Sequence, residues 1–155
     1  TVTGYKRYRA NSLAPDRVNW GRDQRGAMIR VSGADGDPNT HLENRVGESA
    51  ANPYLYTASQ ILSGLDGVRL GQEPPAPTDE PYSTDAPTLP KTLAEAAEAF
   101  EASAFYRKAI GDEFVDFLVA HKRNEAARYE ASELSRVTDP DAVSEWEQRE
   151  YFDLH

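Results

Sequence analysis

The 155-residue sequence contains no cysteine and no apolar run near the roughly 20 residues that a helix needs to cross a bilayer. Without cysteine the chain can form neither disulfides nor thiolate metal sites. Both absences fit a protein of the reducing cytoplasm that does not span a membrane, and we expect that location. With 39% apolar and 28% charged residues, the chain is long enough for one domain with a buried core.

The net charge of −9 is unevenly distributed along the chain. Residues 1–51 hold 8 Lys and Arg against 6 Asp and Glu, whereas residues 52–155 hold 9 against 20. Seven of the eight cations in the first part are arginines, whose planar guanidinium suits carboxylates and phosphates. The acidic remainder argues against nucleic acid and anionic membranes as partners. The arginine-rich part therefore indicates a local anion site.

The central stretch of the sequence predicts two short strands, at 26–31 and 40–46, joined by the turn 32–39. Because side chains alternate along a strand, His41, Glu43 and Arg45 should share one face of the second strand. Arg30 lies on the neighbouring strand. A carboxylate between an imidazole and a guanidinium, beside a further arginine, is an unusual surface to build for stability alone.

The remaining segments predict helices joined by an extended connector. Residues 1–20 should be an extended start and a loop, and a helix should begin at Asn52-Pro53, an N-cap followed by proline at the first helical position. Its broad apolar stripe predicts that this helix is largely buried. Six of the ten prolines lie in 71–90, which excludes a helix there. Further helices are predicted from Thr92 to about Ser103, over 112–135 and over 142–153.

The predicted fold class is α+β, with short antiparallel strands followed by packed helices. We divide the chain into an arginine-rich strand and loop part (1–51), a buried helix (52–70), a proline-rich connector (71–90) and a helical part (91–155).

Four motifs occur in order along the chain: Tyr5-Lys6-Arg7 with Ala14-Pro15, Asp23-Gln24-Arg25 with Ile29-Arg30, His41-Leu42-Glu43-Asn44-Arg45, and Ala51-Asn52-Pro53-Tyr54-Leu55 with Gly64-Leu65-Asp66-Gly67. Together they resemble the C-terminal part of the catalytic domain of the glutamine synthetase family. The resemblance implies that the family's N-terminal domain, and the strands that carry most of its metal-binding carboxylates, are absent from these residues. We therefore expect a fragment that is inactive alone.

The resemblance also implies a reaction, in which ATP phosphorylates the γ-carboxylate of glutamate and an amine then displaces the phosphate. Its cofactors would be ATP and Mg²⁺ or Mn²⁺, and its assembly a ring-type, dodecamer-like homo-oligomer. By the same resemblance, Arg7 and Arg45 would bind glutamate and Glu43 would ligate the metal. Arg25 would be catalytic, stabilising the transferred phosphoryl group, and Arg25, Arg30 and His41 would contact the nucleotide.

Departures from the family pattern bear on the amine. Ammonia-using members place a glutamate just before Ala-Pro, where this chain has Leu13, which makes the amine's entrance apolar. His41 stands where the family has arginine, and Pro38 where a basic residue is common. Trp20 either lines the amine pocket with Leu13 or packs in a core. These departures favour an organic amine over ammonia as the second substrate of a glutamate–amine ligase.

Four other interpretations stay open. The protein could be a true glutamine synthetase in which another residue acts as the base. It could be a non-catalytic family member that binds or regulates. Glu43 could be no more than one partner of a cross-strand ion pair, as most surface carboxylates beside arginine are. An unrelated α+β binding domain would require four coincidental motif matches.

Overall fold

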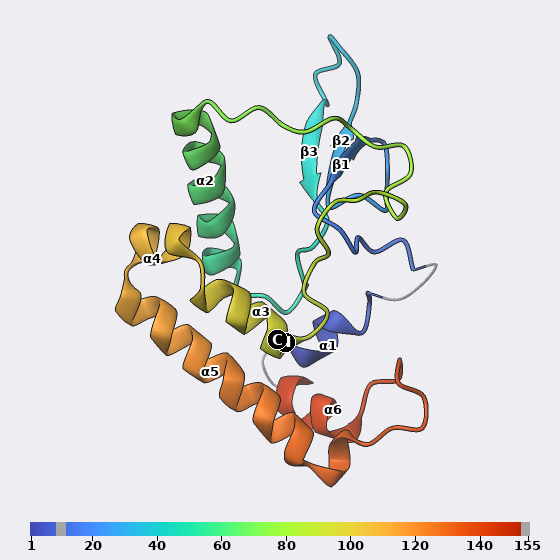
Figure 1. Ribbon diagram of the computed structural model, residues 1–155. Helices are drawn as coiled ribbons and strands as arrows, with labels where there is room; N and C mark the ends of the chain where they lie inside the picture. The colour runs from blue at the N-terminus through green and yellow to red at the C-terminus, as the bar shows by residue number, and fades with distance from the viewer. Residues whose placement is uncertain (9–11, 153–155) are drawn as a thin grey trace. The chain divides into compact units, whose positions relative to one another are not determined.

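The computed structural model describes residues 1–8 and 12–152 (Figure 1). The chain forms two compact units, one of Thr1–Arg7 with Pro90–His155 and one of Tyr8–Leu89. The first unit is helical, and the second carries the strands, one helix and the proline-rich connector. In the described part of the chain, no helix combines the length and apolar character needed to cross a membrane. The strands and helices confirm the α+β class.

A three-stranded sheet organises the second unit: β1 (Trp20–Arg22), β2 (Ile29–Ser32) and β3 (His41–Asn44). β2 lies in the centre, parallel to β1 and antiparallel to β3, and Arg30 pairs with Glu43 across the antiparallel ladder. The two predicted strands are confirmed but are shorter than predicted. Residue 20 was predicted to lie in a loop, but Trp20 is the first residue of β1.

Helix α2 (Pro53–Leu70) begins and ends as its capping residues predict. The Asn52 side chain accepts hydrogen bonds from the backbone N–H groups of Tyr54 and Leu55, and Gly71 ends the helix in the left-handed region at φ +60°. The prediction that this helix is buried was wrong, since none of its residues is buried and Tyr54 is 83% exposed. Periodicity shows that a helix has an apolar stripe but does not show whether anything covers it.

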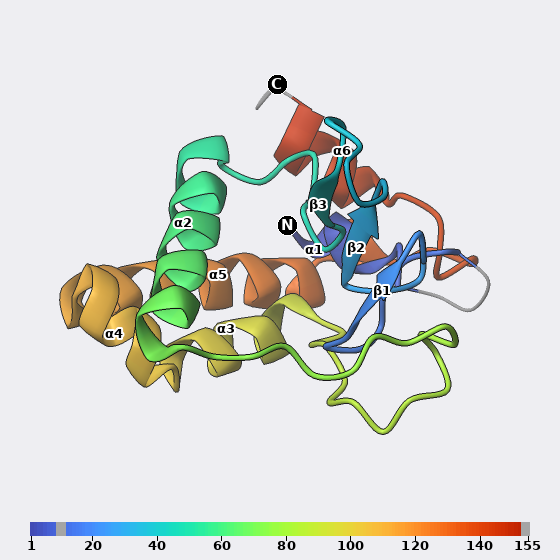
Figure 2. The same cartoon turned by 90° about the horizontal axis from the view of Figure 1, so that it is seen from above.

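The proline-rich connector, residues 71–90, contains no helix, as predicted, and it is fastened to the sheet (Figure 2). The backbone N–H of Thr78 donates to the carbonyl of Trp20 at 2.9 Å, which covers the outer edge of β1. Farther along, the N–H of Leu89 donates to the carbonyl of Asp16 at 2.8 Å. The connector is therefore part of the second unit's structure rather than a free spacer.

The first unit packs helix α3 against helix α5, which run alongside each other in both views (Figures 1 and 2). The core between them is formed by Leu93, Ala97, Val115 and Val119. Phe117 is 66% exposed, because Val115 and Val119 form the buried apolar stripe of α5. The helices of this unit are α1 (Val2–Tyr5), α3 (Leu93–Glu101), α4 (Ala104–Ile110), α5 (Asp112–Ala131), the 3₁₀ turn η1 (Glu133–Ser135) and α6 (Glu145–Tyr151).

Two of these helices were not predicted. Helix α1 replaces the expected extended start, and Thr1 caps it through a hydrogen bond from the N–H of Gly4. Helix α4 follows α3 after a break in which Ser103 serves as a new N-cap. These helices have four and seven residues, which is too few for a helical periodicity of apolar residues to be recognised in the sequence.

A buried ion pair joins α1 to α6, which lie next to each other in Figure 1. The Lys6 ammonium lies 2.6 Å from the Glu147 carboxylate, whose side chain is fully buried. Glu147 also accepts hydrogen bonds from the Thr3 hydroxyl at 2.9 Å and from the N–H of Ser144 at 2.7 Å, the second completing a capping box at the start of α6. Lys6 donates in addition to the carbonyl of Ala142 at 2.7 Å. With the Ser144 hydroxyl, which donates to Glu147 at 2.6 Å, four donors compensate one buried carboxylate.

A second buried carboxylate, Glu125 of α5, lies in the same unit. It accepts a hydrogen bond from the Tyr151 hydroxyl at 2.6 Å and another from the Lys122 ammonium at 2.7 Å. The same Tyr151 hydroxyl accepts the backbone N–H of Val2 at 3.1 Å. The backbone of Val2 is therefore held by Tyr151 of α6, and Glu125 of α5 fixes Tyr151 in turn.

These two carboxylates make the stability of the helical unit depend on pH. Burial alone would raise the pKa of Glu147, but its hydrogen bonds, first from Lys6 and then from Ser144, outweigh burial and lower that pKa below the ordinary value of 4.5. The pKa of Glu125 is lowered in the same way. A depressed carboxyl pKa adds stability that is present above the unfolded value and lost as pH falls through the folded one. Burial raises the pKa of Tyr151, so its contribution is lost as pH rises past about 10.

We therefore expect the free energy of unfolding to be nearly constant between about pH 5 and pH 9 and to fall below about pH 4.5. Urea unfolding at a series of pH values, followed by circular dichroism, measures this dependence. A Glu147→Gln variant should show a shallower decline on the acid side, because one of the two depressed carboxyls is gone. An unfolding free energy at pH 3 equal to that at pH 7 would contradict the expectation.

Candidate active site

The carboxylate of Glu43 lies between two guanidinium groups on one face of the sheet. Its Oε2 is 3.3 Å from Nη1 of Arg30 on β2 and 3.2 Å from Nη1 of Arg45, which follows β3. The antiparallel register brings Arg30 directly opposite Glu43, as the alternation of strand residues predicts. Partial burial would raise the pKa of Glu43, but hydrogen bonds from Arg30 and then Arg45 lower it. The carboxylate is therefore ionised at neutral pH.

Two further groups extend this cluster. The Arg45 Nε donates to the backbone carbonyl of Arg25 at 2.7 Å, which ties the turn after β1 to the end of β3. Arg30 also contacts Asp23 at 3.3 Å, and Asp23 adopts a positive φ of 53°. The sequence analysis did not assign Asp23 to the site, because in the motif Asp23-Gln24-Arg25 it gave a role only to Arg25. Asp23 and Arg30 are only seven residues apart, so a short turn between β1 and β2 could have indicated that they lie close together.

Arg25 and Arg30 keep donors that no acceptor of the described residues uses. Among the described residues, no hydrogen bond or ion pair forms with the exposed Arg25 guanidinium. The Nε of Arg30 is buried and lacks a hydrogen-bond partner within the same residues. Donors left over beside an ionised carboxylate are what an anionic ligand with a divalent cation would use.

Of two other predicted residues, one contacts the turn before β3 and one belongs to the helical unit. His41 is exposed, and its Nδ1 lies 2.6 Å from the carbonyl of Asn39, so one ring nitrogen is engaged by the preceding turn. Arg7 follows α1 and belongs to the helical unit, where Lys6 beside it is fixed by Glu147. The structure thus brings together Arg25, Arg30, Glu43 and Arg45 in one unit, while Arg7 is placed in the other.

Leu13 lies in the loop before β1 in a strained backbone conformation. Its φ is +57°, in the left-handed region that a leucine rarely adopts, and its side chain is 52% exposed. Pro15, two residues later, is fully buried and restricts Ala14 to extended conformations. The loop therefore presents an apolar side chain outward from an anchored base.

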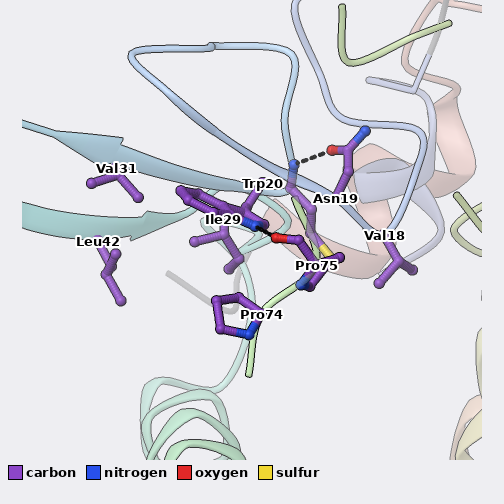
Figure 3. Close-up of a pocket in the computed structure, with 9 residues that line it drawn as sticks. Val18, Asn19, Trp20, Ile29, Val31, Leu42, Pro74 and Pro75 are labelled. Carbon is purple, nitrogen blue, oxygen red and sulfur yellow. Dashed lines mark hydrogen bonds between the residues drawn. The ribbon is translucent and has the colours of Figure 1, made fainter. Parts of the chain in front are cut away.

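Trp20 lies on the opposite face of the sheet from Glu43. Its indole N–H donates to the carbonyl of Pro75 at 2.6 Å, and its ring helps to line an apolar pocket of about 380 Å³ (Figure 3). Side chains from all three strands and from Pro74 and Pro75 of the connector form this pocket, among them Ile29, Val31 and Leu42. Trp20 is therefore not brought to one site with the Glu43 cluster, since the sheet lies between the two side chains.

The donor set supports one metal position but not a complete metal site. In residues 1–8 and 12–152, no three His, Asp or Glu side chains gather closely enough to hold a metal ion. Glu43 can contribute a single carboxylate ligand, and Mg²⁺ and Mn²⁺ prefer such oxygen ligands. A divalent metal at Glu43 would need ligands from outside these residues or from its substrates.

An ionised carboxylate beside arginines with unused donors is the kind of site that an anionic ligand carrying a divalent cation could use. The family model for "Glutamine synthetase, catalytic domain" matches residues 1–150. The chain belongs to the glutamine synthetase family.

Several curated proteins are similar to nearly the whole of this chain. It is 46% identical to a γ-glutamylanilide synthase of Acinetobacter sp. over 156 residues, covering 99% of this chain and 31% of the relative. It is 37% identical to the γ-glutamylethanolamide synthetase GlnA4 of Streptomyces coelicolor, covering 98% and 30%. Glutamine synthetase of Pyrococcus abyssi is 34% identical, with 98% and 37% covered. The chain thus spans about a third of the length of these relatives.

A solved structure shares the fold. The structure titled "GmaS/ADP complex-Conformation 1" superposes with a TM-score of 0.67 at 26% identity, and the match covers 97% of this chain and 36% of the other. That structure confirms the glutamine synthetase-type architecture of the chain.

Proposed function

We propose that the chain is part of an ATP-dependent ligase that joins the γ-carboxylate of glutamate to an organic amine. The γ-carboxylate oxygen attacks the terminal phosphorus of ATP, the bond to ADP breaks, and γ-glutamyl phosphate forms. The amine nitrogen then attacks the acyl carbon, phosphate leaves, and the nitrogen loses a proton. Membership of the family supports the reaction type, and the observation that carries the choice of amine is the outward-facing Leu13 in the loop before β1.

Each residue of the cluster has a part in this proposal. Arg25, with its unengaged guanidinium, stabilises the phosphoryl group in transfer, and Arg30 contacts the ATP phosphates. Glu43 ligates Mg²⁺ or Mn²⁺, which when bound neutralises phosphate charge. Arg45 and Arg7 hold the carboxylates of glutamate. His41 adds a weaker nucleotide contact.

In the structure, the acceptor side of the proposal rests on Leu13, since Trp20 faces away from Glu43. A leucine neither attracts an ammonium ion nor removes its proton, whereas it can contact an alkyl or aryl group. Two relatives named for organic amides, aniline and ethanolamine derivatives, support the same choice. Ring-type self-association and a cytoplasmic location belong to the proposal as well.

The alternative is glutamine synthesis from ammonia, which the Pyrococcus relative favours. Phosphate release and amide formation by the full-length enzyme, measured with ammonia and with a broad panel of alkyl, aryl and hydroxyalkyl amines, separate the two. Ammonia used at least as efficiently as every amine of the panel would overturn the proposal.

Replacing Leu13 with Glu should shift the preference of the full-length enzyme toward ammonia. The new carboxylate can attract an ammonium ion and accept its proton, and it makes the entrance polar. We expect the ratio of kcat/KM for ammonia to that for the best organic amine to rise by about 10- to 100-fold, as one charged contact is gained and one apolar contact is lost. A Leu13→Gln variant is the neutral control. An unchanged ratio would show that this loop does not select the amine.

A further inference from the structure

Tyr82, in the proline-rich connector, joins two loops of the proposed site. Its hydroxyl donates to the carbonyl of Ala14 at 3.2 Å, next to Leu13. Its ring lies against Gly26, the residue after Arg25, so closely that a Cβ atom on Gly26 would lie 2.7 Å from the Tyr82 Cζ and hydroxyl oxygen. One side chain therefore spans from the loop before β1 to the turn that carries Arg25.

The segment around Tyr82 is itself anchored to the sheet. Pro81 is buried, and its carbonyl accepts a hydrogen bond from the Asn19 side-chain amide at 2.7 Å. The same Asn19 side chain accepts the backbone N–H of Met28 at 3.2 Å, which fixes it to the start of β2 (Figure 3). Hydrogen bonds through Asn19 therefore anchor the segment around Tyr82 to the sheet. Tyr82 in turn contacts the loop that contains the strained Leu13.

The loop needs such a support. The left-handed conformation of Leu13 costs conformational energy, so other contacts must hold it in place. Pro15 is buried, and the carbonyl of Asp16 accepts the N–H of Leu89. These contacts fix residues two and three positions after Leu13 rather than its immediate neighbour. The hydroxyl of Tyr82 acts on Ala14, the residue that directly follows Leu13.

The phenol of Tyr82 is a donor at all physiological pH values. Burial, and then the negative charge of Asp16, raise the pKa of Tyr82, while the positive charge of Arg45 opposes them.

We propose that Tyr82 is a positioning residue for the acceptor amine. By bonding Ala14 while packing on Gly26, it holds Leu13 at the site where the amine meets γ-glutamyl phosphate. The inference rests on the proposed function. Water can attack the same acyl carbon, giving glutamate and phosphate, so a loosely held loop should both weaken amine binding and let more intermediate hydrolyse.

The test is a Tyr82→Phe variant of the full-length enzyme, which removes one hydroxyl and keeps the ring against Gly26. The expected result is a rise of about 3- to 10-fold in the KM for the best organic amine, the effect of one lost hydrogen bond. The phosphate released per amide formed should also rise, and the KM for ATP should stay within twofold. Tyr54→Phe, the same chemical change at an 83% exposed position on α2, is the control and should alter none of these quantities.

Hydrogen exchange gives a second, activity-independent readout. Amides of residues 12–19 should exchange faster in Tyr82→Phe than in the wild type or in Tyr54→Phe. Unchanged exchange would overturn the positioning role, and so would equal changes in the KM values for amine and ATP. If the wild-type enzyme forms no amide with any amine, the proposed function fails, and exchange alone then decides whether Tyr82 holds the loop.

Discussion

A full-length enzyme with Glu43 replaced by Gln is expected to lose ligase turnover by on the order of a thousandfold, the scale of removing one group that stabilises transition-state charge. Glutamine keeps the size of the side chain but cannot serve as an anionic metal ligand. It also leaves Arg30 and Arg45 facing each other without the carboxylate that now separates them. The remaining turnover should require a higher concentration of Mg²⁺ or Mn²⁺.

Initial rates of phosphate release over a range of metal concentrations measure both effects. Glu73→Gln, the same change at an exposed position of the connector, should leave the rate and its metal dependence as they are. A Glu43→Gln enzyme with more than a tenth of the wild-type rate and an unchanged metal dependence would show that Glu43 is only an ion-pair partner.

Replacing Lys6 with Met should lower the free energy of unfolding of the helical unit by about 3 kcal/mol. The ammonium that compensates Glu147 would be lost, while the carboxylate stays fully buried. The link that Lys6 makes to the carbonyl of Ala142 would go as well. The remaining donors, Thr3 and Ser144, are neutral and cannot balance the charge.

Tryptophan fluorescence can follow this unit by itself, because Trp146 is one of only two tryptophans and the other is Trp20 of the second unit. Urea titrations of the Lys6→Met variant in a Trp20→Phe background would give the loss of stability. Lys108→Met, at an exposed lysine of α4, is the control and should change it by less than about 0.5 kcal/mol. A loss no larger than that of Lys108→Met would contradict the role given to the buried pair.

The sequence predicted best where a feature depends on neighbouring residues. Asn52 and Pro53 fix the start of α2, and Thr92 caps α3 through the N–H of Glu95. The Glu95 carboxylate in turn accepts the N–H of Lys91, the residue before this cap. Alternation along two adjacent strands was likewise enough to place Arg30 beside Glu43.

Features that depend on distant residues were not predictable in this way. Lys6 stood in a motif that assigned a role to Arg7, and nothing near it in the sequence indicated Glu147, 141 positions away. The Ser144–Glu147 capping box was a local signal for the start of α6, yet it could not show that the same carboxylate receives Lys6. Tyr82 was missed for the same reason, since it contacts Ala14, 68 positions earlier in the sequence, and also Gly26.

The contact between α1 and α6 has a consequence for the order of folding. All of the strand unit, Tyr8–Leu89, is continuous in sequence, so it can form while the rest of the chain is still being synthesised. The helical unit draws on both ends, and Lys6 gains its partner only after Glu147 has been made. Closing a contact over so many residues is slow compared with local helix formation. Residues 1–7 should therefore reach their native place only after α6 has formed.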